Sequence, residues 1–295
     1  MKNDKKVIAL GFFDGVHVGH QALLRECVRL AGVLDCQAAA ITFDTHPEAL
    51  ITGKAPGLLN TGPDRLRLLQ RYGVQQVYTF DFNRETMRMS WQDFFKILLD
   101  DGAAGLVCGN DFRFGHRGEG SAQKLSDACR DAGIPCVVVP EQTVKGIRIS
   151  STHIRSLLER GEMESATHFL GHPHILTGTV VSGRRLGRTL GFPTANLTIP
   201  EGVIAPRYGV YACQVELNGV RYNAVANVGT RPTVSGHHVT VEPWILDFEG
   251  DLYGREITLE FYRFLRPETR FDSLEDLRRQ ILADGEETRK FFEKV

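Results

Sequence analysis

Two histidines three residues apart stand in a glycine-rich stretch near the start of the chain. The stretch reads GFFDGVHVGHQALL (11–24), in which His20 follows Gly19 directly and His17 is two residues from both Gly15 and Gly19. An apolar run precedes it and helical periodicity follows, which predicts a turn between a strand and a helix. The helix N-terminus offers free N–H groups to a phosphate, and two imidazoles can donate to the same anion. The spacing therefore predicts a phosphate site, whereas a metal site would need a third ligand that is not nearby.

Alternating apolar runs and amphipathic segments provide the framework for that turn. Segments with helical spacing separate the apolar runs, and further helix-like segments extend from 151 to about 170. This alternation predicts a doubly wound α/β domain with a parallel sheet, in which ligands bind at the carboxyl ends of the strands. The predicted strands are 7–12, 37–43, 74–80, 103–108 and 134–139, and the predicted helices between them begin near 19, 63, 90 and 121.

The second half of the chain is rich in β-forming residues. Asn218-Gly219 between two alternating runs predicts a hairpin, and the segment 241–265 is interpreted as a second hairpin. Closely spaced strands with turns predict a small antiparallel barrel. Ser273 with Asp276 resembles a capping box that opens a C-terminal helical pair. The seam "LGHPHILTG" places the boundary near His172, which gives domains 1–172 and 173–295.

Length and composition agree with a two-domain protein of the cytoplasm. The chain has 295 residues, a net charge of −1 and 42% hydrophobic residues, so it predicts no nucleic-acid or membrane partner. No apolar run reaches about 18 residues, and no signal-peptide cleavage site follows the short N-terminal run. None of the six cysteines forms a CxxC pair, so neither a zinc nor a redox motif is indicated. The oligomeric state is left open.

Four motifs together resemble one enzyme family. The pattern Gly-x-Phe-Asp-x-x-His-x-Gly-His (11–20) is similar to the adenylyl- and cytidylyltransferase signature. "GNDFRFG" (109–115), "ISSTHIR" (149–155) and "GRTLGFPTANL" (187–197) resemble the bifunctional riboflavin kinase/FMN adenylyltransferase family, the prokaryotic FAD synthetases. The resemblance covers nearly the whole chain. It implies a Rossmann-like α/β nucleotidyltransferase domain followed by a small antiparallel β-barrel of the flavokinase type with C-terminal helices.

The resemblance implies that the N-terminal domain adenylylates FMN with ATP and releases pyrophosphate. By family position, the catalytic residues are His17, His20 and Arg155. The family match also gives two sets of binding residues. For ATP they are Gly11, Phe13, Asp111, Arg148 and Ser151, and for flavin they are His46, Phe112 and Phe114. Thr45 stands where the family usually has proline, which leaves the rigidity of the backbone before His46 in question.

The resemblance implies that the C-terminal domain phosphorylates riboflavin to FMN. Glu242 matches the family's base for the riboflavin 5′-hydroxyl, and Thr194 with Asn196 match its Mg-ATP ligands, since Mg²⁺ prefers oxygen donors. Relatives usually have histidine at the position of Trp244 and lack Pro243. The remaining matches are Gly187 and Arg188 for ATP, and Arg266 and Phe271 for flavin. Mg²⁺ is expected with ATP, and no permanently bound cofactor is expected.

Two other functions fit parts of the pattern. A monofunctional FMN adenylyltransferase would keep the N-terminal motifs while Pro243 and Trp244 disable the kinase domain. A flavin-binding protein without turnover would use the same folds but would not need paired histidines at a phosphate. The main hypothesis is one chain that takes riboflavin to FMN and then to FAD, with riboflavin, FMN and ATP as its small-molecule partners.

Overall fold

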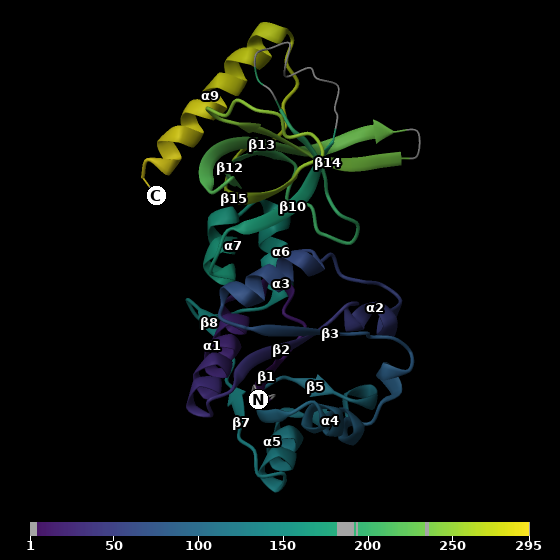
Figure 1. Ribbon diagram of the computed structural model, residues 1–295. Helices are drawn as coiled ribbons and strands as arrows, with labels where there is room; N and C mark the ends of the chain where they lie inside the picture. Colours follow the sequence, from purple (N-terminus) through teal and green to yellow (C-terminus); the bar gives the residue numbers. More distant parts are fainter. Residues whose placement is uncertain (1–4, 182–191, 193, 234–235, 295) are drawn as a thin grey trace. The chain divides into compact units, whose positions relative to one another are not determined.

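The computed structural model describes residues 5–181, 192, 194–233 and 236–294, which form two compact units (Figure 1). The first unit comprises Met1–Leu58 and Gly62–Ser151, and the second comprises Leu59–Thr61 and Thr152–Val295. Each unit has its own hydrophobic core. No helix among the described residues is both long enough and apolar enough to span a membrane.

A five-stranded parallel sheet forms the centre of the first unit, in the order β3-β2-β1-β4-β7. Every residue of β1 is buried, as the central strand of a covered parallel sheet requires. The predicted alternation of strands and helices is therefore confirmed. The strands are β1 (Lys6–Leu10), β2 (Gln37–Phe43), β3 (Gln76–Phe80), β4 (Ala103–Gly109) and β7 (Cys136–Val139).

The first helix, α1 (Val18–Val33), lies against β1, β2 and β4. It buries Leu24, Cys27 and Leu30, a stripe at helical spacing. The other helices of this unit are α2 (Pro47–Thr52), α3 (Gly62–Arg71), α4 (Trp91–Asp100) and α5 (Ala122–Asp131), with short 3₁₀ turns at Asp14–Val16, Thr86–Arg88 and His116–Gly118. Two small hairpins pair β5 (Arg113–Phe114) with β6 (Gly120–Ser121), and β8 (Thr143–Val144) with β9 (Ile147–Arg148).

A closed antiparallel barrel forms the second unit, in the order β10-β11-β14-β13-β12-β15. This arrangement confirms the predicted small barrel. Its strands are β10 (His174–Val181), β11 (Asn196–Thr198), β12 (Gly209–Leu217), β13 (Val220–Thr233), β14 (Gly236–Ile245) and β15 (Glu256–Arg266), and its helices are α6 (Ser151–Arg160), α7 (Met163–Leu170) and α9 (Leu274–Phe292).

One of the two predicted hairpins is confirmed and the other is wrong. Leu217 pairs with Val220 across Asn218 and Gly219, and both turn residues have positive φ, as a two-residue hairpin requires. The segment 241–265 is not a hairpin, because β14 pairs with β13 and β11 whereas β15 pairs with β10 and β12. In the closed barrel β14 and β15 lie beside different strands, and their adjacency in sequence does not indicate which strands those are.

A single C-terminal helix replaces the predicted helical pair. Ser273 caps α9, since its hydroxyl accepts the backbone N–H of Asp276 at 3.1 Å and donates to the Asp276 carboxylate at 2.6 Å. The helix continues without a break past Gly285 to Phe292. Gly285 is buried within the helix, so it acts as a packing position and not as a helix end.

Candidate active sites

The turn after β1 holds both histidines at the N-terminus of α1. His17 is the N-cap residue, and its Nδ1 accepts the backbone N–H of His20 at 3.2 Å. The two imidazole rings stack with 3.6 Å between centroids. A side chain at Gly19 would come within 3.2 Å of the His17 ring, so that ring would have to shift slightly to admit one. The turn thus presents two stacked rings at the end of a strand, where a phosphate can bind.

His20 is held in its neutral form. Burial, followed by the nearby His17 and the positive charge of Arg65, lowers the pKa of His20 well below its usual range. Its Nδ1 is buried and has no hydrogen-bond partner. A neutral imidazole still has one N–H to donate, and it avoids the cost of placing a charge in a buried site.

Gly11 and Phe13 shape the same turn. A side chain at Gly11 would come within 3.2 Å of the Phe13 ring. Phe13 itself has a left-handed backbone conformation and a ring that is fully buried against His20. The Phe13 side chain is therefore not available for contact with a nucleotide.

Asp111 follows β4, Arg148 is the last residue of β9, and Ser151 is the first residue of α6. Arg148 and Asp111 form an exposed ion pair with 2.8 Å between Nη2 and Oδ2. The Ser151 hydroxyl donates to the Asp14 carbonyl at 3.1 Å, which joins the start of α6 to the histidine turn. Arg155 lies on α6 one turn after Ser151. The structure therefore brings the "ISST" motif to the turn that carries His17 and His20.

His46 lies at the N-terminus of α2 and is well fixed without the family's proline. Its Nδ1 accepts the Glu48 backbone N–H at 3.2 Å, and its ring packs edge-on against Phe12 with 4.6 Å between centroids. The Asp44 carboxylate accepts the backbone N–H groups of Thr45 and Phe82 at 2.6 and 2.8 Å. These two bonds hold the backbone before His46 in place.

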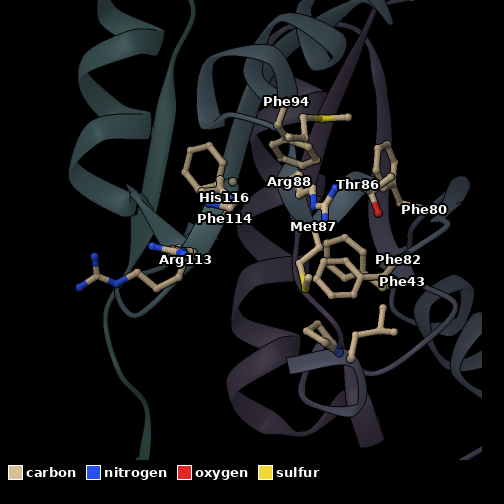
Figure 2. Close-up of a pocket in the computed structure, with 16 residues that line it drawn as sticks. Phe43, Phe80, Phe82, Thr86, Met87, Arg88, Phe94, Arg113, Phe114 and His116 are labelled. Atoms are coloured by element: carbon tan, nitrogen blue, oxygen red, sulfur yellow. The ribbon is translucent and has the colours of Figure 1, made fainter. Parts of the chain in front are cut away.

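A large cavity with an aromatic wall lies in the first unit (Figure 2). Its volume is about 1040 Å³. Phe43, Phe80, Phe82 and Phe114 contribute rings to its lining, and Arg88, Arg113 and His116 contribute nitrogen groups (Figure 2). We call it the aromatic cavity. Its flat apolar walls and basic groups suit a planar ring system that carries a negative charge.

The predicted flavin residues have different relations to the aromatic cavity. Phe114 lines it, and Phe112 stacks on Phe114 with 5.4 Å between ring centroids. Phe112 packs against the sheet core and is not among the lining residues of the described chain. Pro47, the neighbour of His46, also lines the cavity. The sequence alone gave no sign of Phe43, Phe80 and Phe82, because single phenylalanines in strands are typical of any core.

A second cavity lies in the barrel unit and brings together distant parts of the sequence. Its volume is about 270 Å³, and we call it the barrel cavity. Thr194, Glu242, Arg266 and Phe271 all line it, although they span more than seventy residues of sequence. The structure therefore gathers four of the predicted site residues at one surface. A hydroxyl, a carboxylate and a guanidinium beside apolar walls suit phosphoryl transfer to an alcohol.

Arg266 is fixed in the barrel cavity by a residue that sequence reasoning missed. Asp284 of α9 is 3% exposed and accepts from Arg266 Nε at 3.0 Å and from Nη2 at 2.7 Å. Gln280 donates to the same carboxylate at 2.9 Å. This paired geometry holds the Arg266 fork rigidly. An acidic residue on the buried side of an amphipathic helix was the available signal.

Asn196 lies next to this site, and two predicted residues cannot be placed. Asn196 is 6% exposed, and its Oδ1 is buried without a hydrogen-bond partner. Its side chain is therefore short of one interaction that a ligand can supply. The predicted ATP residues Gly187 and Arg188 lie outside the described residues.

Pro243 and Trp244 are accommodated without breaking β14. The register between β13 and β14 runs unbroken through Pro243, whose carbonyl accepts the Ala195 N–H at 2.9 Å. The ladder between β14 and β11 includes Thr240 and Val241, and pairing resumes where Trp244 bridges Thr194. Proline thus occupies a gap in that ladder, where its missing N–H costs little. Trp244 packs edge-on against Phe192 with 4.8 Å between centroids and lines the barrel cavity.

We expect Gly285→Ala to destabilise the barrel unit only while Trp244 is present. A Cβ at position 285 would lie 2.8 Å from Trp244 Cζ3. Overpacking lowers the free energy of unfolding by about 1–3 kcal/mol, whereas replacing a helical glycine with alanine raises it by about 1 kcal/mol. Thermal unfolding followed by circular dichroism should show a lower melting temperature for Gly285→Ala than for the wild-type chain. The same change made in Trp244→Leu should raise the melting temperature. Glu287→Ala, at an exposed site of the same helix, should show no such reversal, and equal effects in both backgrounds would contradict the packing argument.

Comparisons with known proteins agree with the two-unit architecture. The FAD synthetase family model matches residues 1–153, and the riboflavin kinase family model matches residues 170–292. A Listeria monocytogenes bifunctional riboflavin kinase/FMN adenylyltransferase is 36% identical to this chain, over 98% of this chain and 93% of its own length. The Escherichia coli K12 protein of the same description is 38% identical, over 97% of this chain and 92% of its own.

A solved structure has the same fold over almost the whole chain. It is the crystal structure of a Streptococcus pneumoniae protein described as a macrolide-efflux protein. The TM-score is 0.87 at 32% sequence identity, and the match covers 98% of this chain and 97% of the other. The order of the two units is therefore shared along the full length.

Proposed function

Because this chain belongs to the bifunctional riboflavin kinase/FMN adenylyltransferase family, and is an enzyme that phosphorylates riboflavin and adenylylates FMN, we propose how its own residues carry out these two reactions. We assign adenylylation to residues 1–172 and phosphorylation to residues 173–295. We also assign the protein to the cytoplasm, since its six cysteines are free thiols, which suits a reducing compartment.

In the adenylylation reaction, a phosphate oxygen of FMN attacks the α-phosphorus of ATP and pyrophosphate leaves. No covalent intermediate with the enzyme is needed, so the protein must align the two phosphates and stabilise the developing charge. We assign His17 and His20 as donors to the ATP phosphates, because their stacked rings lie at the N-terminus of α1. Ser151, bonded to the same turn, is assigned to this phosphate site as well. Arg155 is assigned to the reaction by its position in the family motif.

Asp111 and Arg148 are assigned to the nucleotide part of the adenylylation site. Their exposed ion pair follows β4 and β9, so both side chains are accessible to ATP. Gly11 and Phe13 support the turn through their backbone conformations. The flavin of FMN is assigned to the aromatic cavity with Phe114 in its wall, while Phe112 and His46 act as neighbours that hold the wall in place.

In the kinase reaction, we assign Glu242 as the base. Its carboxylate takes the proton of the riboflavin 5′-hydroxyl while that oxygen bonds to the γ-phosphorus of ATP and ADP leaves. Arg266 and Phe271 of the barrel cavity are assigned to the flavin, with Asp284 as the positioning residue of Arg266. The observation that carries this assignment is the convergence of Thr194, Glu242, Arg266 and Phe271 on one cavity.

Mg²⁺ bound with ATP fits the residues that are present. Asn196 Oδ1 is a buried oxygen without a partner, and Thr194 supplies a hydroxyl two residues away along the same strand segment. Mg²⁺ binds oxygen donors, and it needs only a few from the protein when phosphates supply the remaining ligands. When bound, the ion would neutralise charge on the transferring phosphates. Among the described residues no group of three His, Cys, Asp or Glu side chains forms a metal site of its own.

A product assay tests the proposed function. The full chain is mixed with riboflavin, ATP and Mg²⁺, and flavins are separated by chromatography over time. We expect FMN to rise first and FAD to follow, and we expect a chelator to stop both steps. FAD formation from supplied FMN but no FMN from riboflavin would mean that Pro243 and Trp244 disable the kinase. Binding of flavin without either product would instead support a flavin-binding protein.

A further inference from the structure

Arg65 is a buried cation on α3 that none of the four sequence motifs includes. The residue is 3% exposed. Its Nη2 donates to the Phe43 carbonyl at 2.8 Å, and its guanidinium carbon lies 4.3 Å from the centre of the Phe12 ring. One nitrogen and one face of the guanidinium are therefore occupied, and the group is held in a fixed orientation.

The rest of the Arg65 guanidinium lacks partners. Nε and Nη1 are both buried, and neither has a hydrogen-bond partner. Arginine keeps its charge under all ordinary conditions. Two nitrogens of a cation are therefore removed from water here without a hydrogen bond that replaces it. Leaving buried donors of a charged group unsatisfied is costly, and native structures keep such groups for a reason.

The fixed carboxylates nearby do not satisfy these donors. Asp14 and Asp44 attract the Arg65 charge and raise its pKa, although desolvation is the larger effect and lowers it. The Asp44 carboxylate is already an acceptor for two backbone N–H groups, those of Thr45 and Phe82. The unpaired Nε and Nη1 of Arg65 thus lack an acceptor that the described residues supply.

The position of Arg65 identifies the kind of anion. Phe12 follows the end of β1, and Phe43 is the last residue of β2, so the guanidinium sits at the carboxyl ends of two neighbouring strands. The Arg65 charge also acts on His20, the second histidine of the turn after β1. Ligands of open parallel sheets bind at this edge, and the ligands of this site carry phosphates.

We propose that Arg65 is a phosphate-binding residue of the adenylylation site, and that one of its two unpaired groups, Nε–H or Nη1–H, donates to a phosphate of FMN or ATP. The planar guanidinium holds its N–H groups in fixed directions, which the single ammonium of lysine does not. The inference rests on the proposed adenylylation function and adds a residue to it. The attacking phosphate of FMN and a phosphate of ATP share this chemistry, so the kinetics must separate them.

The test compares Arg65→Met and Arg65→Lys with the wild-type chain in FAD formation from FMN and ATP. We expect kcat/KM to fall about 10²-fold in Arg65→Met, and to fall less in Arg65→Lys because it keeps a cation. A loss confined to the FMN titration assigns the contact to the FMN phosphate, and a loss confined to the ATP titration assigns it to ATP. Arg71→Met, an exposed cation on the same helix, should stay within twofold of wild type.

Thermal unfolding of each variant serves as the folding control for the unit that contains Arg65, and riboflavin phosphorylation by the same molecules shows that the other unit is intact. Equal losses in Arg65→Met and Arg65→Lys would overturn the proposal, since packing and not charge would then matter. FAD formation within twofold of wild type in Arg65→Met, with the kinase intact, would also overturn it. If the wild-type chain itself made no FAD, the proposed adenylylation function would fail first, and the two failures are thereby distinguished.

Discussion

Glu242→Gln is expected to lower FMN formation from riboflavin about 10²- to 10⁴-fold, which is the usual contribution of a general base. The amide has nearly the same shape as the carboxylate and still lines the barrel cavity beside Thr194. It cannot accept the proton of the riboflavin hydroxyl, so the loss should appear in kcat. Initial rates at saturating ATP, with flavins separated by chromatography, measure it.

Two further measurements make the Glu242 result decisive. FAD formation from supplied FMN should be unchanged, because the adenylylation residues other than Arg155 lie in the other unit. Glu216→Gln, an exposed glutamate on β12, should leave both rates within twofold of wild type. A Glu242→Gln rate within threefold of wild type would exclude this residue as the base. Glu268, the other glutamate that lines the barrel cavity, would then be tested.

His20→Ala is expected to lower FAD formation about 10²- to 10³-fold, the usual loss on removing one preorganised donor from a transition-state site. His20 is preferred over His17 as the test because the His17 ring also caps α1, so His17→Ala would lose helix stability of about 1 kcal/mol as well. Rates of FAD formation from FMN and ATP measure the effect. His20→Asn, which keeps a donor, should retain more activity than alanine.

The control for His20 is a histidine outside both sites. His168 is exposed on α7, and His168→Ala should leave FAD formation unchanged. Riboflavin phosphorylation by His20→Ala should also be unchanged, which shows that the barrel unit is folded, and an unchanged thermal unfolding profile would show the same for the unit that contains His20. FAD formation within threefold of wild type in His20→Ala would remove this histidine from the mechanism.

The parallel sheet could be predicted from the sequence because its determinants are local. Each strand is a continuous apolar run, and each helix is an amphipathic segment between two runs. Right-handed crossovers then leave few arrangements for such an alternation. The barrel differs, because β14 and β15 are adjacent in sequence but have different neighbours. Pairing in a closed barrel depends on which edges meet at closure, and no local pattern records that.

The site residues also differ in whether a local sequence pattern indicates them. His17 and His20 could be predicted because both stand in one short turn together with the glycines that shape it. Arg65 could not, since a single arginine in an amphipathic helix is usually exposed. Its spacing with Leu68 and Leu69, both buried, was nevertheless a signal, because it places a cation on the apolar side of α3. Asp284 of α9 was hidden for the same reason.

Trp244 and Gly285 also limit which residues can stand together at positions 244 and 285. The indole occupies the space that a side chain at 285 would need. A larger residue at 285 is disfavoured while the tryptophan is present, and a helical glycine costs stability where no large ring fills the gap. The effect of a substitution at either position therefore depends on the residue at the other. Transplanting Trp244 alone into a relative with a larger residue at 285 would therefore fail for reasons unconnected with catalysis.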